Sequence, residues 1–278
     1  MPKRLTEDAV QFYREHGYFS PVPVLSADEV ARYRAELENH EAALGHPLDF
    51  PEKSKSYLLY KWADALVHHP AVLDAVEDVI GPDILVYHST TWIKEPGTPA
   101  YVRWHQDGKY FFLKPALHIT AWVALSDATV ESGCVHVLPG SHNWGDFDHR
   151  DDLGEWNMIK RGQFIADRFD DQVGEPIELK AGEMSLHHTN LVHCSRGNEG
   201  IDRRIGLGIS YIPASVRQYG EPQATALLVR GKAREGAFGP ETRLGEEGSA
   251  ASLAAHTKSV SLFRARQDMG RADLAVDS

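Results

Sequence analysis

The sequence has little cysteine, no long hydrophobic run and no excess of positive charge. Only two of its 278 residues are cysteines, which excludes a disulfide-stapled scaffold and suits a reducing compartment. No stretch approaches the roughly 18 consecutive apolar residues that a membrane-spanning helix needs. The first residues also lack the apolar segment of a secretory signal. We therefore expect a cytoplasmic globular protein.

The balance of charge narrows the class of partner. Asp and Glu together number 40 and Lys and Arg 29, which gives a formal net charge of −11. A negative surface repels nucleic-acid phosphates and anionic lipid headgroups. We therefore expect a small-molecule substrate and neither a nucleic-acid nor a membrane partner, while the oligomeric state stays open.

Residues 1–81 are predicted to be mainly helical. The segment Ser26–Glu29 has the S-x-x-E pattern of a capping box, and Pro70 suits the first turn of a helix. Glycines follow several of the apolar-periodic segments and predict helix ends. The helices expected here are Thr6–His16, Ser26–Leu44, Tyr57–His68 and Pro70–Gly81.

Residues 82–213 follow a different pattern of short, β-rich segments separated by turn residues. Such punctuation is typical of an all-β sandwich or jelly roll, and no helices alternate with the strands as a parallel α/β sheet requires. The expected strands are Ile84–His88, Thr90–Lys94, Tyr101–His105, His118–Leu125, Val135–Leu138, Glu183–His187, Leu191–Cys194 and Ile205–Ile212.

The remaining segments interrupt or follow this core. Residues 143–169 form a polar insertion, residues 220–250 are rich in Gly, Glu and Arg, and a helix is predicted over residues 252–269. No repeat or linker divides the chain. We therefore expect one domain over residues 1–278, in which residues 214–278 supply a C-terminal lid and helix.

The segment Arg103–Asp107 carries the first chemical signal. His105 and Asp107 flank one residue, and positions i and i+2 of a strand project to the same face, so the pair is suited to hold one metal ion. Alone this spacing is weak, because the sequence repeats it at His149 and Asp151. That second copy lies in the polar insertion, and we interpret it as a solvated loop.

Residues further along the chain complete the pattern. His193 ends an apolar segment, and Arg204 follows it by eleven residues at the start of another. Two histidines and one carboxylate form the facial triad of non-haem Fe(II) oxygenases, which leaves coordination positions open. An arginine supplies a planar fork for a carboxylate. His187 and His188 are rival ligands, and Arg203 competes with Arg204 for the inward position.

Taken together, the motifs resemble the phytanoyl-CoA dioxygenase family. The segments that carry the resemblance are Trp104–Asp107, Thr120–Asp127, Glu131–His142, His193–Asn198 and Arg204. The resemblance implies a double-stranded β-helix, that is a jelly-roll or cupin-like core, flanked by helices. It also implies Fe(II), 2-oxoglutarate and O2 as cofactor and co-substrates.

The resemblance further implies a role for each matching residue. His105, Asp107 and His193 would bind iron, Arg204 would bind the distal carboxylate of 2-oxoglutarate, and Ser195 and Trp122 would help to hold that co-substrate. Related halogenases carry a small residue at the position of Asp107, so the carboxylate favours hydroxylation. Tyr87 is a further contact that no motif supports.

The sequence says least about the substrate. We expect a small polar metabolite, such as an amino-acid-like compound, an aminophosphonate or a natural-product intermediate. Lys109, Arg103 and Asn190 are the candidate substrate contacts, and Lys109 would face the site if its strand continued beyond Asp107. The alternative is a metal-binding cupin-like isomerase, or a ligand-binding module without oxygenase turnover.

Overall fold

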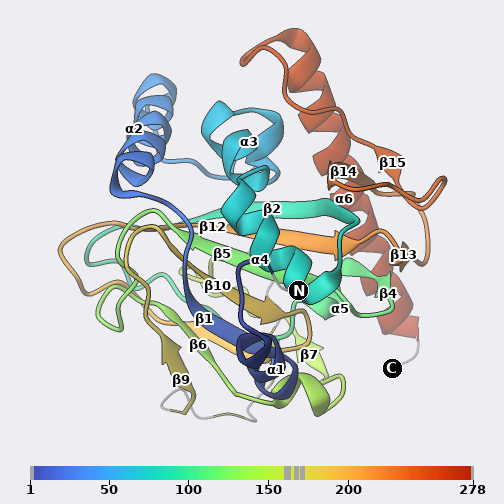
Figure 1. Cartoon of the computed structure of the whole chain (residues 1–278), viewed down its shortest axis with the longest axis horizontal. Helices are drawn as coiled ribbons and strands as arrows, with labels where there is room; N and C mark the ends of the chain where they lie inside the picture. The colour runs from blue at the N-terminus through green and yellow to red at the C-terminus, as the bar shows by residue number, and fades with distance from the viewer. Residues whose placement is uncertain (1–2, 160–163, 166–168, 170–172, 277–278) are drawn as a thin grey trace.

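Two facing, mainly antiparallel sheets with helices outside them make up the molecule (Figure 1). The computed structural model describes residues 3–159, 164–165, 169 and 173–276. This arrangement confirms the predicted mainly-β architecture with flanking helices. Among the described residues, no helix is long and apolar enough to cross a membrane.

The larger sheet has seven strands in the order β1-β10-β5-β12-β2-β14-β15. Its centre is fully buried, because one face packs against helices and the other faces the smaller sheet. The strands are β1 (Tyr18–Pro23), β10 (Glu183–His188), β5 (Ile119–Ala124), β12 (Arg204–Pro213), β2 (Ile84–Lys94), β14 (Thr225–Arg230) and β15 (Gly239–Pro240).

The smaller sheet has four strands in the order β3-β11-β6-β9. Two short two-stranded ribbons, β4-β13 and β7-β8, accompany it. The strands are β3 (Val102–His105), β11 (His193–Ser195), β6 (Val135–Val137), β9 (Glu175–Ile177), β4 (Leu113–Lys114), β13 (Arg217–Gln218), β7 (His149–Arg150) and β8 (Phe164–Ile165).

The helices begin and end close to where the local signals place them. The Thr6 hydroxyl accepts the amide of Ala9, and Ser26 and Glu29 form the expected capping box. The predicted third helix is shorter than expected, since residues 56–58 form a 3-10 turn before it. The helices are α1 (Glu7–His16), α2 (Ala27–Leu44), α3 (Lys61–Val67), α4 (Pro70–Ile80), α5 (Gly108–Phe111) and α6 (Ala250–Val276).

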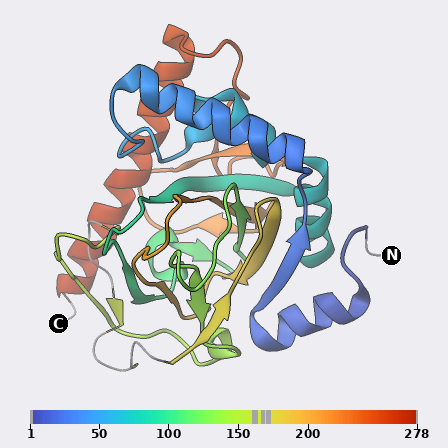
Figure 2. The ribbon, with the colours of Figure 1, turned by 90° about the vertical axis from the view of Figure 1, so that its left-hand side faces the viewer.

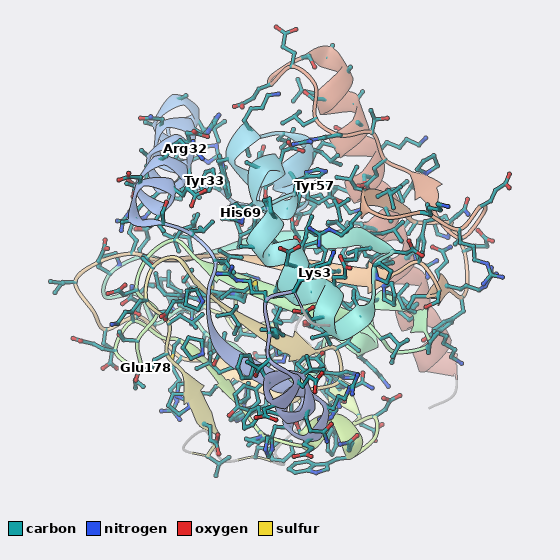
Figure 3. All side chains as sticks on the ribbon, in the orientation of Figure 1. Lys3, Arg32, Tyr33, Tyr57, His69 and Glu178 are labelled. Carbon is teal, nitrogen blue, oxygen red and sulfur yellow. The ribbon has the colours of Figure 1, made fainter. Side chains whose placement is uncertain are left out.

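Helices α2, α3 and α4 lie on the same side of the larger sheet, and α6 runs along one edge of the molecule (Figure 2). A hydrophobic core that includes Leu37, Trp62, Val76, Ile209 and Leu227 joins the helices to the sheet. His69, labelled in Figure 3 at the start of α4, lies 3.2 Å from a carboxylate oxygen of Glu29 on α2. The helical layer thereby supports the sheet from outside and leaves its inner face for the site.

Three segments differ from the sequence-based expectations. Residues 18–23, within the part predicted to be helical, form strand β1, whose Pro21 and Pro23 obscure the strand signal. Residues 225–230, within the predicted lid, form β14 and pair with β2 in the larger sheet. The insertion holds the ribbon β7-β8, although part of it lies outside the described residues.

Candidate active site

Strands β3 and β11 bring the two histidines together. They are antiparallel neighbours, and their register places His193 directly opposite His105. The two imidazole ring centres lie 4.0 Å apart, and both side chains are buried. Residues nearly ninety positions apart in the chain therefore meet because the small sheet pairs them.

Asp107 lies beside the two histidines, but a helix cap positions it and not the predicted strand. Strand β3 ends at His105, and Asp107 lies at the N-terminal cap of the one-turn helix α5. Its Oδ1 atom lies 3.4 Å from Nε2 of His105 and 3.8 Å from Nε2 of His193. One ligand atom from each of the three residues falls within 4.8 Å of the others, and this set fits a first-row transition metal.

The hydrogen bonds behind the histidines fit the same interpretation. Nδ1 of His105 lies 2.8 Å from the carbonyl of Arg103, and Nδ1 of His193 lies 2.9 Å from the carbonyl of Leu191. A carbonyl accepts only from a protonated nitrogen, so each Nε2 keeps a lone pair for a metal. The Thr120 hydroxyl donates to Oδ2 of Asp107 at 3.1 Å and leaves Oδ1 toward the histidines.

The charges of the cluster are coupled. Burial alone would raise the pKa of Asp107, but His193, His105 and His187 outweigh it and hold the pKa far below its usual value. Burial, followed by the neighbouring His105, lowers the pKa of His193 to about 4. At neutral pH the site thus presents a carboxylate and a neutral imidazole, the forms that bind a metal ion.

The rival histidines occupy other positions. His187 is buried beside the cluster, with Nε2 3.9 Å from Oδ2 of Asp107 and its ring centre 4.9 Å from that of His193. It lines the inner cavity, and no hydrogen bond is seen between it and Asp107. His188 accepts the amide of Asn190 at 3.1 Å and lies outside the residues that line the cavities described below.

An inner cavity extends from the cluster into the space between the sheets. Its empty volume, counted to the mouth, is about 630 Å³, and its lining includes Trp122, Ser195 and Arg204. Arg204 is 2% exposed, and its Nε has no hydrogen-bond partner among the described residues. Its guanidinium carbon lies 5.3 Å from the ring centre of Trp122. An uncompensated buried cation is costly, so the cavity suits an anionic ligand.

Arg203 points the other way, as strand alternation requires. Its guanidinium pairs with the carboxylates of Glu41 and Glu95, each at 2.7 Å. The two neighbouring arginines therefore point in opposite directions. Arg203 binds carboxylates on the outer side, and Arg204 faces the cavity.

Lys94 is a buried basic residue that sequence reasoning missed. It lies opposite Arg204 in the β2-β12 pairing, is fully buried, and donates to Oγ of Ser195 at 2.9 Å and to the carbonyl of Arg196. Burial and the nearby Arg204 lower its pKa to about 6. Because Lys94 fills an acceptor position on Ser195, the hydroxyl hydrogen of Ser195 is directed elsewhere. The sequence indicates this residue only as a lysine at the end of a predicted strand that is rich in β-branched residues.

An outer cavity opens from the same cluster on the other side. Its empty volume, counted to the mouth, is about 930 Å³. His105 and Asp107 line both cavities, whereas His193 and Arg204 line only the inner one. The proposed metal ligands therefore lie at the junction of two compartments.

The three predicted substrate contacts lie elsewhere. None of Lys109, Arg103 and Asn190 lines either cavity. The strand premise for Lys109 is wrong, since the chain turns into α5 after Asp107. Arg103 packs over the Phe164 ring at 4.3 Å and lies 3.5 Å from Asp152, and the carbonyl of Asn190 accepts from Gln106 at 2.8 Å.

His149 has a structural role that the solvated-loop interpretation missed. Its Nε2 accepts the backbone amide of Gln106 at 3.0 Å, and its Nδ1 lies 2.8 Å from the carbonyl of Phe147. Gln106 is the residue between His105 and Asp107. The expectation of a solvated loop is therefore wrong for His149, which fixes the backbone that carries two candidate ligands.

Comparison with known proteins agrees with this geometry. A "Probable alpha-ketoglutarate-dependent hypophosphite dioxygenase" from Stutzerimonas stutzeri is 28% identical over 73% of this chain and 77% of its own. A "1-deoxypentalenic acid 11-beta-hydroxylase" from Streptomyces arenae is 28% identical over 74% of this chain and 80% of its own. A solved structure titled "non-heme monooxygenase; ThoJ apo" superposes with a TM-score of 0.84 and 31% identity, covering 96% of this chain and all of that one.

The sequence profile described as "Phytanoyl-CoA dioxygenase (PhyH)" matches residues 13–206. This range contains the candidate metal ligands and Arg204, and it extends over most of both sheets. The chain belongs to the phytanoyl-CoA dioxygenase family.

Proposed function

We propose that the protein is an Fe(II)- and 2-oxoglutarate-dependent hydroxylase in which His105, Asp107 and His193 hold the iron. The observation that carries this proposal is the convergence of their three ligand atoms within 4.8 Å, with both histidine Nδ1 atoms facing carbonyl oxygens. Bound iron and 2-oxoglutarate would supply the chemistry that activates O2 for attack on a C–H bond.

The inner cavity provides the features that 2-oxoglutarate requires. Arg204 keeps its charge at neutral pH, although burial lowers its pKa to about 10, and its free Nε suits the distal carboxylate. Ser195 can donate its hydroxyl hydrogen to the same carboxylate, because Lys94 holds the oxygen from the other side. Trp122 covers the guanidinium. These contacts orient the co-substrate and exclude water from the iron.

The alternative of a metal-binding isomerase or a turnover-free binding module has less support. Neither has a need for a buried, carboxylate-directed arginine beside the metal cluster. We also propose a cytoplasmic setting, since Cys134 and Cys194 are both buried thiols and form no disulfide.

The test is an anaerobic titration with Fe(II) followed by 2-oxoglutarate, read by the visible charge-transfer absorption of the chelate. Wild-type protein should develop the band and, on admission of air, form succinate. His193→Ala should lose the band, whereas His187→Ala, which changes a matched buried histidine on β10 of the facing sheet, should retain it. Loss of the band in His187→Ala and its retention in His193→Ala would contradict the ligand assignment.

A further inference from the structure

The outer cavity has walls that no motif in the sequence describes. Helix α6 contributes Val260, Phe263, Arg264 and Gln267 to its lining. Its empty volume of about 930 Å³, which includes open solvent at the mouth, exceeds the corresponding volume of about 630 Å³ for the inner cavity. The outer cavity is therefore the larger of the two, and its additional wall from α6 favours a larger substrate than the small polar metabolite expected from the sequence.

Aromatic side chains form much of the wall near the metal cluster. Trp92, Phe111 and Phe263 all line the cavity, and the ring centres of Phe111 and Phe263 lie 6.0 Å apart. The His88 ring stacks on Phe263 at 4.1 Å with an interplanar angle of 13°. Such a wall gains roughly 25 cal/mol for each Å² of apolar surface that a ligand buries, so it suits a flat apolar skeleton.

The charged residues of the wall are of one sign, apart from the proposed iron ligand. Among the described residues that line the cavity, Lys53 and Arg264 are cationic and Asp107 is the one acid. The guanidinium carbon of Arg264 lies 3.6 Å from the ring centre of Phe50, another lining residue, in a cation–π contact. Lys53 pairs at 2.8 Å with Asp49, whose side chain is 65% exposed. The two cationic side chains among the lining residues, in a chain of net charge −11, favour an anionic ligand.

His88 adds a polar contact where the two cavities meet. It lines both of them, and its Nε2 lies 3.1 Å from the Thr90 hydroxyl. Its Nδ1 is buried and has no hydrogen-bond partner among the described residues. A buried nitrogen without a partner costs free energy, and a hydroxyl or carbonyl group of a ligand would satisfy it.

We propose that the prime substrate is an amphipathic organic acid, with a ring-containing apolar skeleton against Trp92 and Phe263 and a carboxylate at Arg264. His88 would bind a hydroxyl or carbonyl group on the part of the skeleton nearest the iron. This inference rests on the proposed function, because that function makes the outer cavity the prime-substrate site.

The test compares matched ligands. The probes are carboxylic acids with benzene, naphthalene and fused alicyclic skeletons, each beside its methyl ester. Binding to the iron-free protein is measured by quenching of tryptophan fluorescence, since Trp92 lines the cavity. Binding to the anaerobic Fe(II)–2-oxoglutarate protein is measured by the shift of its absorption band. Fused-ring acids should bind more tightly than benzene acids and about tenfold more tightly than their esters, as expected for one charge-assisted contact.

Two variants locate the charge contact. Arg264→Gln should remove the roughly tenfold preference for the acid over the ester and leave ester affinity unchanged. Lys258→Gln, an exposed cation on the same helix that lines neither cavity, should keep the preference. Equal affinity for acids and esters in the wild type, or a preference that survives Arg264→Gln, would overturn the proposal.

A third variant addresses His88, and a second readout separates the two proposals. His88→Phe keeps an aromatic ring against Phe263, and it should weaken binding of hydroxylated acids several-fold more than that of unsubstituted acids; an equal effect on both would overturn the role of His88. If acids bind but iron and 2-oxoglutarate give no succinate, the oxygenase function fails and the ligand class stands. If succinate forms but no acid is preferred, the ligand class fails alone.

Discussion

The inner and outer cavities share a wall that includes His88, Trp92, His105 and Asp107, but beyond it they are built from different parts of the chain. Strands of the two sheets supply most of the inner cavity, whose buried polar groups include Arg204 and Ser195, with Lys94 behind Ser195. Helix α6 and residues 50–54 and 158–159 supply much of the outer one, where aromatic and aliphatic side chains dominate. The groups proposed to bind iron and 2-oxoglutarate thus lie mostly on paired strands, whose register fixes their positions. The groups proposed to select the prime substrate lie on helix and loop surfaces.

This difference between the cavities predicts which property of the enzyme each substitution should change. Changes in the cluster should remove turnover, changes at the inner cavity should act on 2-oxoglutarate, and changes at the outer wall should act on stability and the prime substrate. A variant that changes a quantity assigned to a different region would contradict this division of roles.

The largest effect is expected for His105→Ala. The variant removes a proposed iron ligand whose Nε2 lies 3.4 Å from Asp107. Succinate formation should fall by more than about 100-fold, because even outer-shell partners of a metal ligand are worth roughly 10–100-fold. Iron content after anaerobic loading and the circular dichroism spectrum distinguish loss of the metal from loss of the fold. Iron bound at wild-type affinity would show that His105 is not a ligand.

Lys55→Met should give the largest loss of stability on the outer side. Lys55 is 1% exposed, and its Nζ donates to Glu241 at 2.6 Å. Tyr57, which Figure 3 labels near α3 and α6, and Ser259 on α6 donate to the same carboxylate. Leaving Glu241 buried without its cation should cost about 3–5 kcal/mol of unfolding free energy, measured by denaturant titration.

The matched control for this variant removes both charges. Lys55→Met combined with Glu241→Leu should recover part of the loss, since no unpaired buried charge remains. The single variant should also weaken prime-substrate binding, because α6 carries part of the outer wall. A larger change in 2-oxoglutarate affinity than in prime-substrate binding would contradict the division between the cavities.

Arg204→Gln should act on the inner cavity alone. The neutral amide cannot pair with the distal carboxylate of 2-oxoglutarate, and truncating one partner of a buried charge pair costs about 2 kcal/mol or more. The KM for 2-oxoglutarate should rise at least about 30-fold, while iron affinity should stay near that of the wild type. Arg203→Gln is the matched control, because Arg203 faces Glu41 and Glu95. Equal KM values for the two variants would refute the assignment.

The sequence predicted the strand-borne part of the site and little else of it. His105, His193 and Arg204 are readable because motif order and strand alternation constrain them, and the pairing of β3 with β11 places the histidines opposite each other. Strand alternation is an incomplete reason for predicting Asp107, since this residue follows the strand. Lys109 was misplaced because local spacing does not reveal where a strand gives way to a helix. Phe263 and Arg264 carry no signal, because only tertiary packing brings α6 to the cavity.

The smallest effect is expected for His149→Ala, and it tests how far support for the cluster extends. The variant removes the acceptor for the Gln106 amide, and one lost neutral hydrogen bond is worth about 1 kcal/mol. Iron affinity should fall a few-fold and 2-oxoglutarate KM should stay unchanged, both read from the anaerobic titration. Asp151→Ala, in the same ribbon region, lacks that acceptor role and should leave iron affinity unchanged. An unaltered iron affinity in His149→Ala would mean that β3 and α5 hold the ligands without help from the insertion, so that the rigidity of the inner cavity comes from the sheets alone.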